Sequence, residues 1–186
     1  MAVEEPKYTA LVSDGACELR RYAPVIVAEV RVTGEMQAAT NAGFRLLAGY
    51  IFGGNDARKS VAMTAPVTLA ASTGTKIAMT APVTLAGREG DWIVQFTMPR
   101  QWSLETLPVP NDPRVRLRPV PEMLMAVLKF SGLTSPPRVA RKSAELAAWA
   151  AERDLEISGT PSLARYDPPW TPWFMRRNEV MVQVKG

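Results

Sequence analysis

The chain has 186 residues, of which 47% are hydrophobic, which is enough for one globular domain with a substantial core. It contains no histidine and a single cysteine, Cys17, so zinc sites built from His and Cys, Ser-His-Asp triads, Cys-His dyads and an internal disulfide are all excluded. The formal net charge of +4 is mild and scattered, and no run of Lys and Arg indicates nucleic-acid binding.

The amino-terminal residues lack the basic and apolar regions of a signal peptide. The longest apolar stretches are broken well before the ~20 residues that a membrane span requires. Together with the lone cysteine, these features predict a cytoplasmic protein without a membrane span.

The first predicted elements are two strands and a helix. Residues 17–22 and 25–32, the latter rich in β-branched side chains, are separated by Ala23-Pro24 and are predicted as consecutive strands. From residue 35 to residue 52 the apolar spacing changes to i, i+3, i+4, i+7, which predicts an amphipathic helix that ends at Gly53-Gly54. Its predicted buried stripe consists of Met36, Ala39, Thr40, Gly43, Phe44, Leu47, Tyr50 and Ile51.

A ten-residue phrase with a central proline occurs twice, at residues 61–70 and 77–86, and only its first residue differs. Because proline cannot donate to a strand ladder, each copy is predicted as an edge or rim strand, and residues 71–76 as the turn of a local hairpin. Residues 91–98 alternate and stop before Pro99, which predicts a third strand.

The second half follows a Pro-rich connector at residues 107–113 and repeats the layout of the first half. It is predicted to contain strands at 115–120 and 123–130, a helix at 138–154 after Pro136-Pro137, a strand at 162–166, a Pro-rich loop, and a final strand at 178–184. We therefore expect a single domain over residues 1–186, with pseudo-repeat halves at about 15–98 and 113–184.

Several separated motifs lie at residues 43–55, in the two Met-Thr-Ala-Pro-Val phrases, and at 92–99, 107–113, 130–132, 166–173 and 178–180. In this order they resemble the motifs of the SOUL/haem-binding protein family. The resemblance extends from about residue 8 to the end of the sequence. The resemblance implies an α+β fold: a distorted antiparallel β-barrel with two flanking helices, similar to the effector-binding domains of drug-sensing regulators. It also implies that the protein is not an enzyme but a carrier or buffer, which binds haem or another tetrapyrrole in a shallow apolar cleft.

In the family, the cleft lies between the outer face of the first helix and the loop that here spans residues 168–173. The resemblance and the helical spacing together predict the cofactor-binding residues Asn41, Phe44, Arg45, Ala48, Phe52, Trp170, Thr171 and Trp173. A Phe beside an Arg suits a flat apolar ligand with acidic side groups, and tryptophans in a stiff Pro-rich loop suit stacking. In the competing interpretation, Phe52 tucks under the glycine turn, Arg45 is solvated, and the tryptophans cap the barrel core.

Histidine ligation of a haem iron is impossible in this chain, so an axial ligand would be Met, Tyr, Cys or Lys, or would be absent. Met63 and Met79 are the nearest candidates, although methionines more often fill core gaps. Basic residues that face the cleft in some relatives are replaced here by Asn41, Gly49 and Thr171.

Two further patterns bear on rival functions. Arg114, Arg116 and Arg118 share one strand face, predicted to be a solvated edge that discourages pairing. The alternation in the last strand favours Val180 and Val182 inside, which predicts Glu179 at the surface.

If Glu179 pointed inward instead, a buried carboxylate could hold a cationic ligand or act as a base. The alternative function is therefore a binding module for cationic amphiphiles with Glu179 or Glu29 as the counter-ion, and hydrolysis through a buried Glu stays open. A third hypothesis makes the helix at 138–154 a docking element for a partner protein.

Overall fold

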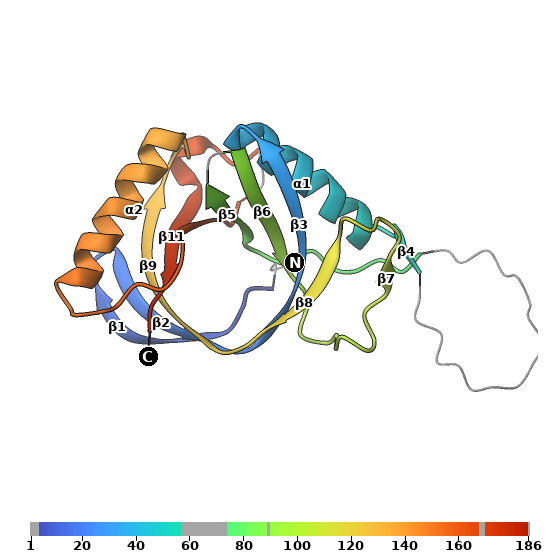
Figure 1. Ribbon diagram of the computed structural model, residues 1–186, viewed down its shortest axis with the longest axis horizontal. Helices are drawn as coiled ribbons and strands as arrows, with labels where there is room; N and C mark the ends of the chain where they lie inside the picture. The colour runs from blue at the N-terminus through green and yellow to red at the C-terminus, as the bar shows by residue number, and fades with distance from the viewer. Residues whose placement is uncertain (1–3, 57–73, 89, 168–169, 186) are drawn as a thin grey trace, which may run out of the picture.

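The computed structural model describes residues 4–56, 74–88, 90–167 and 170–185 (Figure 1). Its helices are α1 (Met36–Ile51), α2 (Pro136–Ala151) and the short 3-10 helix η1 (Trp173–Met175). Its strands are β1 (Tyr8–Asp14), β2 (Cys17–Tyr22), β3 (Val25–Gly34), β4 (Asn55–Asp56), β5 (Val83–Arg88), β6 (Gly90–Thr97), β7 (Val109–Pro110), β8 (Arg116–Val120), β9 (Met123–Ser131), β10 (Ser162–Arg165) and β11 (Arg177–Gln183).

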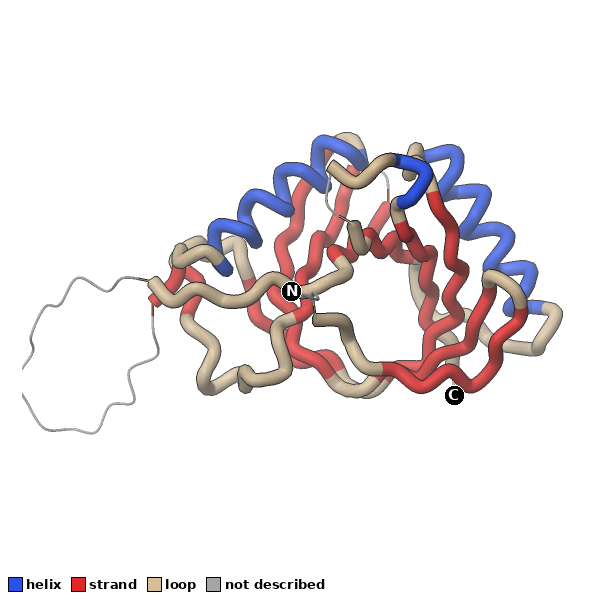
Figure 2. Tube along the Cα trace, turned by 180° about the vertical axis from the view of Figure 1, so that it is seen from behind, coloured by secondary structure: helices blue, strands red, loops and turns tan. Residues whose placement is uncertain are grey.

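Nine of these strands form one antiparallel sheet in the order β1-β2-β9-β11-β10-β5-β6-β3-β8, and β4 pairs with β7 separately. The sheet curves strongly, and α1 and α2 lie on its outer side (Figures 1 and 2). Its edge strands β1 and β8 do not pair with each other within the described residues, so the predicted barrel is in fact an open, curved sheet. The predicted combination of two flanking helices and a large antiparallel sheet is confirmed.

Helix α1 packs against β6 and β3 through the stripe that the sequence predicts. The buried residues of α1 are Met36, Ala39, Thr40, Gly43, Leu47, Tyr50 and Ile51. At Gly43 the helix lies so close to β6 that an added Cβ would come within 2.4 Å of a methyl carbon of Val94. The helix ends beside Gly53, whose positive φ of 117° is one that glycine adopts without steric cost.

Helix α2 covers β9 and β11 on the other half of the outer side. Its buried residues Leu146, Trp149 and Ala150 pack against Val180 and Val182 of β11. Pro136 and Pro137 occupy the first turn, where their missing N–H groups leave no hydrogen bond unmade. The predicted helix is thus present, but it begins at Pro136 and ends at Ala151 rather than spanning 138–154.

The structure differs from the expected strands at β1, at the short pair of β4 and β7, and at the repeated phrase. Strand β1 was not predicted, because all of its residues are exposed and its pattern carries no buried face. The first copy of the repeated phrase lies outside the described residues, and the second copy forms a strand only from Val83 onward. The residues before Val83 do not pair as a strand and make separate backbone hydrogen bonds instead. Ile77 N donates to Ile51 O, and Ala81 N donates to Glu4 O.

No helix in the described part of the chain is both long enough and apolar enough to cross a lipid bilayer. The element order places a strand pair, a helix and a second strand pair in each half, with β2, β3, α1, β5 and β6 followed by β8, β9, α2, β10 and β11. An origin by duplication stays a prediction.

Candidate functional site

The predicted site residues of α1 do not all share one surface. Asn41 and Arg45 are exposed on the outer face, and Arg45 Nε donates to the Asn41 carbonyl at 3.3 Å. Ala48 is half-buried. The ring of Phe44 packs edge-on against Phe96 with centroids 5.4 Å apart, so this side chain belongs to the margin of the core.

Phe52 and the predicted loop lie at opposite ends of α1. Phe52 is 59% exposed and follows the last residue of the helix. The loop begins near the other end, because Nη2 of Arg165 lies 3.4 Å from Oε1 of Gln37 in the first turn. The 16 residues of α1 span roughly 24 Å, so one macrocycle cannot contact both ends. The structure therefore places Gln37 and Asn41 nearer to the loop than Phe52.

The chain between β10 and β11 exposes an unusual number of large apolar side chains. Trp170, Trp173, Phe174 and Met175 are exposed by 83%, 56%, 60% and 65%, and we call residues 170–175 the aromatic segment. The rings of Trp173 and Phe174 lie edge to face at 5.7 Å. Neither indole closes the core, which disagrees with the interpretation of the tryptophans as caps of the core. The sequence prediction missed Phe174 and Met175, although they directly follow Trp173.

The aromatic segment is tied to the sheet at its end. Arg176 Nε donates to the carbonyl of half-buried Thr171 at 2.8 Å. Met175 N donates to the carbonyl of Pro172, which closes the single turn of η1. In Figure 2 this short helix lies between the amino ends of α1 and α2. The exposed rings are thus held on a short, braced turn.

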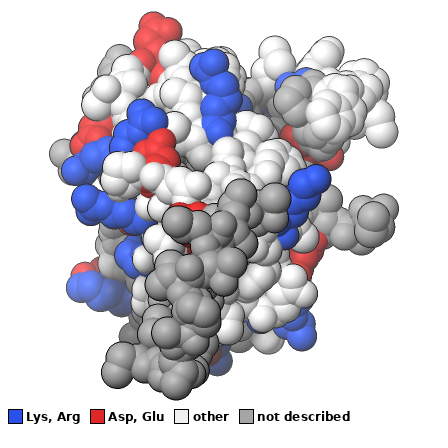
Figure 3. Space-filling model, turned by 90° about the vertical axis from the view of Figure 1, so that its right-hand side faces the viewer, with Lys and Arg blue, Asp and Glu red and all other residues white. Residues whose placement is uncertain are grey.

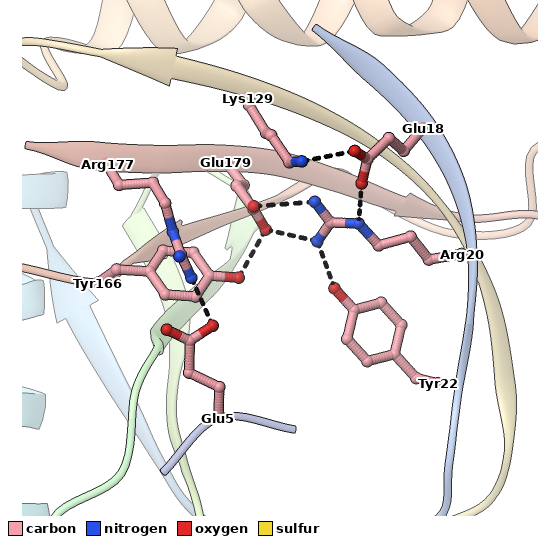
Figure 4. A network of polar contacts seen from close by, with 8 residues as sticks. All are labelled: Glu5, Glu18, Arg20, Tyr22, Lys129, Tyr166, Arg177 and Glu179. Atoms are coloured by element: carbon pink, nitrogen blue, oxygen red, sulfur yellow. Dashed lines mark hydrogen bonds and ion pairs between the residues drawn. The ribbon is translucent and has the colours of Figure 1, made fainter. Parts of the chain in front are cut away.

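A second cluster of polar side chains lies on the inner side of the curved sheet (Figure 4). Glu179, only 1% exposed, accepts two hydrogen bonds from the fully buried Arg20, at 2.9 and 3.0 Å. Tyr166 donates its hydroxyl to Glu179 Oε2 at 2.5 Å, and Arg20 donates to Tyr22 and Glu18, each at 2.7 Å. We call these residues the inner network.

The expectation that Glu179 lies at the surface is wrong. Val180 and Val182 do face the core under α2, but Met181 packs on the opposite side with Met125 and Val127. Because the strongly curved sheet encloses its inner side, both faces of β11 are buried, and Glu179 shares the inner face with Met181.

The charged side chains of the inner network form ion pairs with one another and with Lys129. Burial raises the pKa of Tyr22 to about 12, and burial together with Glu179 raises the pKa of Tyr166 well above its ordinary value. Burial alone would raise the pKa of Glu18, but hydrogen bonds from Lys129 and Arg20 outweigh it and hold that pKa below the ordinary value. The carboxylate of Glu18 therefore stays ionised, and Glu179 is paired with Arg20.

The amino-terminal residues around Glu5 lie beside the inner network. Arg177 stacks 3.5 Å from the ring centroid of Tyr166 and donates to Glu5 at 2.5 Å. A pocket of about 50 Å³ adjoins this segment and is lined by residues that include Pro6 and Met98. This volume is far below the 300–1,000 Å³ of a typical small-molecule site.

The other candidate residues lie apart from both clusters. Arg114, Arg116 and Arg118 are exposed as expected, and Arg118 pairs with the half-buried Glu29 at 3.1 Å. Figure 3 shows Lys and Arg side chains along one side of the molecule with Asp and Glu between them, next to a broad area without charge.

Of the two methionines predicted as axial-ligand candidates, one lies among the described residues. Met79 is 39% exposed, and Met63 falls outside the described residues. In the described ranges, no three His, Cys, Asp or Glu side chains form a group that could hold a metal ion.

Comparisons with known proteins agree on the fold and the family. The crystal structure of the EcmrR C-terminal domain matches with a TM-score of 0.64 and 12% identity over 96% of this chain and 98% of that one. A protein described as a hydrolase encoded by lin2189 from Listeria innocua matches with a TM-score of 0.59 and 12% identity over 91% of each chain. At such identities, these likenesses show a shared fold alone.

No curated protein matches the chain at a significant level. The family model described as SOUL heme-binding protein matches residues 3–183, nearly the whole length. The chain therefore belongs to the SOUL haem-binding protein family.

Proposed function

We propose that this protein binds haem or a related tetrapyrrole without catalysing a reaction, as a carrier or buffer, and that the flat macrocycle stacks on the aromatic segment. The observation that carries the proposal is the exposure of Trp170, Trp173, Phe174 and Met175 within six residues. Monomeric soluble proteins rarely leave large contiguous apolar patches in water, and such patches mark binding sites. Membership of a haem-binding family names the class of ligand.

The physical basis of binding is contact area between rigid rings. A Trp or Phe side chain buries 150–250 Å² when it is covered, and its π face favours offset stacking on another planar ring. Pro172 and the single turn of η1 restrain the backbone before binding, which reduces the entropy that ordering the site would cost. Binding of this kind needs no metal coordination.

An axial contact to the iron is compatible with the site but is not required. Met175 supplies a thioether inside the aromatic segment and is better placed than Met79 for this role. With no histidine in the chain, a weak or absent axial ligand implies that the metal-free porphyrin binds with similar affinity to haem.

The rival ligand class, a cationic amphiphile held by Glu179, is less well supported. Glu179 is buried as that hypothesis requires. However, Arg20 already neutralises it through two hydrogen bonds, and Tyr166 occupies a further lone pair. Glu29, the other proposed counter-ion, is engaged by Arg118 and Gln95. A cationic ligand would have to displace these partners.

The test is a blank-corrected titration of purified protein with hemin and, separately, with protoporphyrin IX. We expect a shift of the Soret band and quenching of tryptophan fluorescence at micromolar concentrations of either ligand. A titration in which hemin changes neither signal contradicts the proposal. Stabilisation against heat by cationic dyes, with no effect of either porphyrin, would support the rival ligand class.

A further inference from the structure

Arg165 is a cation that pairs with no carboxylate in the part of the chain that the structure describes. It ends β10, and its side chain is half-buried between the amino ends of the two long helices. Its Nη2 donates to Thr134 Oγ1 at 2.5 Å and to Gln37 Oε1 at 3.4 Å, while the buried Nε has no hydrogen-bond partner. Among the described residues, no carboxylate forms an ion pair with it, whereas the fully buried Arg20 is paired with Glu18 and Glu179.

Such an arrangement costs stability. A charge removed from water without a partner carries a desolvation penalty of several kcal/mol, and neutral hydrogen-bond acceptors offset only part of it. Burial lowers the pKa of Arg165, and the nearby charge of Arg176 lowers it further. Because an arginine keeps its proton at any physiological pH, the site holds an uncompensated positive charge.

The surrounding helices add to this positive potential. The amino ends of α1 and α2 converge over the sheet (Figures 1 and 2). Neither Ser135 nor Glu35, the residues before the two helices, caps its helix with a side-chain hydrogen bond, and neither first turn contains an acidic residue. The first turn of α2 contributes Arg138 instead, whose Nε also lacks a partner. Helix amino ends and guanidinium groups both favour an anion.

Asp167, two residues along the chain, and Glu35, next to the first turn of α1, do not fill this role. Asp167 accepts a hydrogen bond at 2.5 Å from the backbone N–H of Arg177. Glu35 is exposed and forms no cap. The aromatic segment begins five residues after Arg165, and its short helix η1 lies between the amino ends of α1 and α2, where Gln37 and Thr134 contact Arg165.

We propose that Arg165, at the base of the aromatic segment, binds an oxyanion of the ligand, namely a carboxylate side group of the stacked tetrapyrrole. Thr134 and Gln37 hold the guanidinium in place through Nη2, and no described carboxylate competes for it. The inference rests on the proposed function, because the ligand that brings the carboxylate is the tetrapyrrole. Basic residues that face the cleft in some relatives are replaced here by Asn41, Gly49 and Thr171. The proposal assigns their role to Arg165 of β10.

The test compares protoporphyrin IX with its dimethyl ester, which keeps the macrocycle but loses both negative charges. The variants are Arg165→Gln, Arg165→Lys and, as a matched control, the exposed Arg116→Gln on β8. We expect Arg165→Gln to weaken binding of the free acid about 10- to 100-fold, as for loss of a charge-assisted hydrogen bond, and to leave binding of the ester unchanged. Arg165→Lys should recover part of the loss, and Arg116→Gln should behave as the wild type.

A second measurement separates this inference from the proposed function. Inorganic phosphate, added at constant ionic strength, should raise the thermal midpoint of the wild type and of Arg116→Gln more than that of Arg165→Gln. The unliganded Arg165→Gln variant should unfold at the same temperature as the wild type or higher, because it has lost an unpaired charge.

If neither porphyrin binds the wild type, the proposed function fails, and the phosphate measurement still decides whether Arg165 is an oxyanion site. Equal loss of acid and ester binding in Arg165→Gln would overturn the carboxylate assignment while the proposed function stands. Identical affinities of Arg165→Gln and Arg116→Gln for the free acid would overturn it as well.

Discussion

The guanidinium of Arg20 and the carboxylate of Glu179 form a two-pronged ion pair on the inner side of the curved sheet, although 159 positions separate them in the sequence. Strand β9 lies between β2 and β11, so the pair spans one intervening strand. The inner side is therefore organised by polar contacts, while the aromatic side chains are exposed on the outside.

Breaking the Arg20–Glu179 pair should be strongly destabilising. We expect Glu179→Gln to lower the free energy of unfolding by about 3–5 kcal/mol, because the buried guanidinium loses its partner. The measurement is urea denaturation followed by circular dichroism. The exposed pair Arg31–Asp91 provides the control, and Asp91→Asn should change stability by less than about 1 kcal/mol. Equal effects of the two substitutions would contradict the buried role.

Stability should fall at alkaline pH because of Tyr22. Burial raises its pKa to about 12 from the ordinary value of 10.0. Between these values the unfolded chain releases the phenolic proton while the folded chain keeps it, so stability is complete below pH 10 and is lost as the pH rises toward 12. The loss attributable to this group is about 2–3 kcal/mol.

Tyr22→Phe should flatten the corresponding part of the curve of unfolding free energy against pH. The exposed Arg116→Gln on β8 is the control and should leave that part unchanged. A Tyr22→Phe protein with the same alkaline slope as the wild type would show that other groups are responsible.

Two glycines of α1 should respond in opposite directions to alanine. Gly43→Ala would bring a Cβ within 2.4 Å of Val94 and should lower the free energy of unfolding by about 1–3 kcal/mol. Gly49→Ala meets no atom within 4 Å and should raise it by about 0.5–1 kcal/mol through helix propensity. Thermal and urea unfolding of both variants check the signs, and a stabilising Gly43→Ala would contradict the close contact between α1 and β6.

The exposed rings should matter for binding and not for folding. We expect Trp170→Ala combined with Trp173→Ala to weaken hemin binding at least about tenfold, because two stacking surfaces are lost. The unfolding free energy should change by less than about 0.5 kcal/mol, as is usual for exposed positions. The half-buried Trp92, whose Nε1 donates to Gly34 O, is the control; Trp92→Phe should leave hemin affinity unchanged. Unchanged affinity in the double variant would move the site elsewhere.

Much of the architecture could be predicted from the sequence because it depends on local periodicity. The buried stripe of α1 follows from apolar residues at helical spacing, and the start of β3 follows from the β-branched run after Pro24. The repeated phrase predicted the strands less well. The last four residues of its second copy belong to β5, and residues before them form separate hydrogen bonds.

The candidate site was only partly predictable. Trp170 and Trp173 were identified through the family motif, and the structure exposes both. Phe52 was grouped with them from helix geometry, but only the tertiary arrangement shows that the aromatic segment lies at the opposite end of α1. Arg165 carried no signal at all, since an arginine at the end of a strand is ordinarily solvated.

The sequence by itself determined the secondary structure, the family and the chemistry that a histidine-free chain cannot perform, since these depend on residue types and short-range spacing. Only the tertiary structure decided which charges are paired. Alternation along β11 shows that two faces exist, but the curvature of the sheet decides that both are buried and that Glu179 meets Arg20. The convergence of two helix ends likewise decides that Arg165 is buried without a carboxylate among the described residues. Pairing depends on contacts between distant segments, and local pattern carries no information about them.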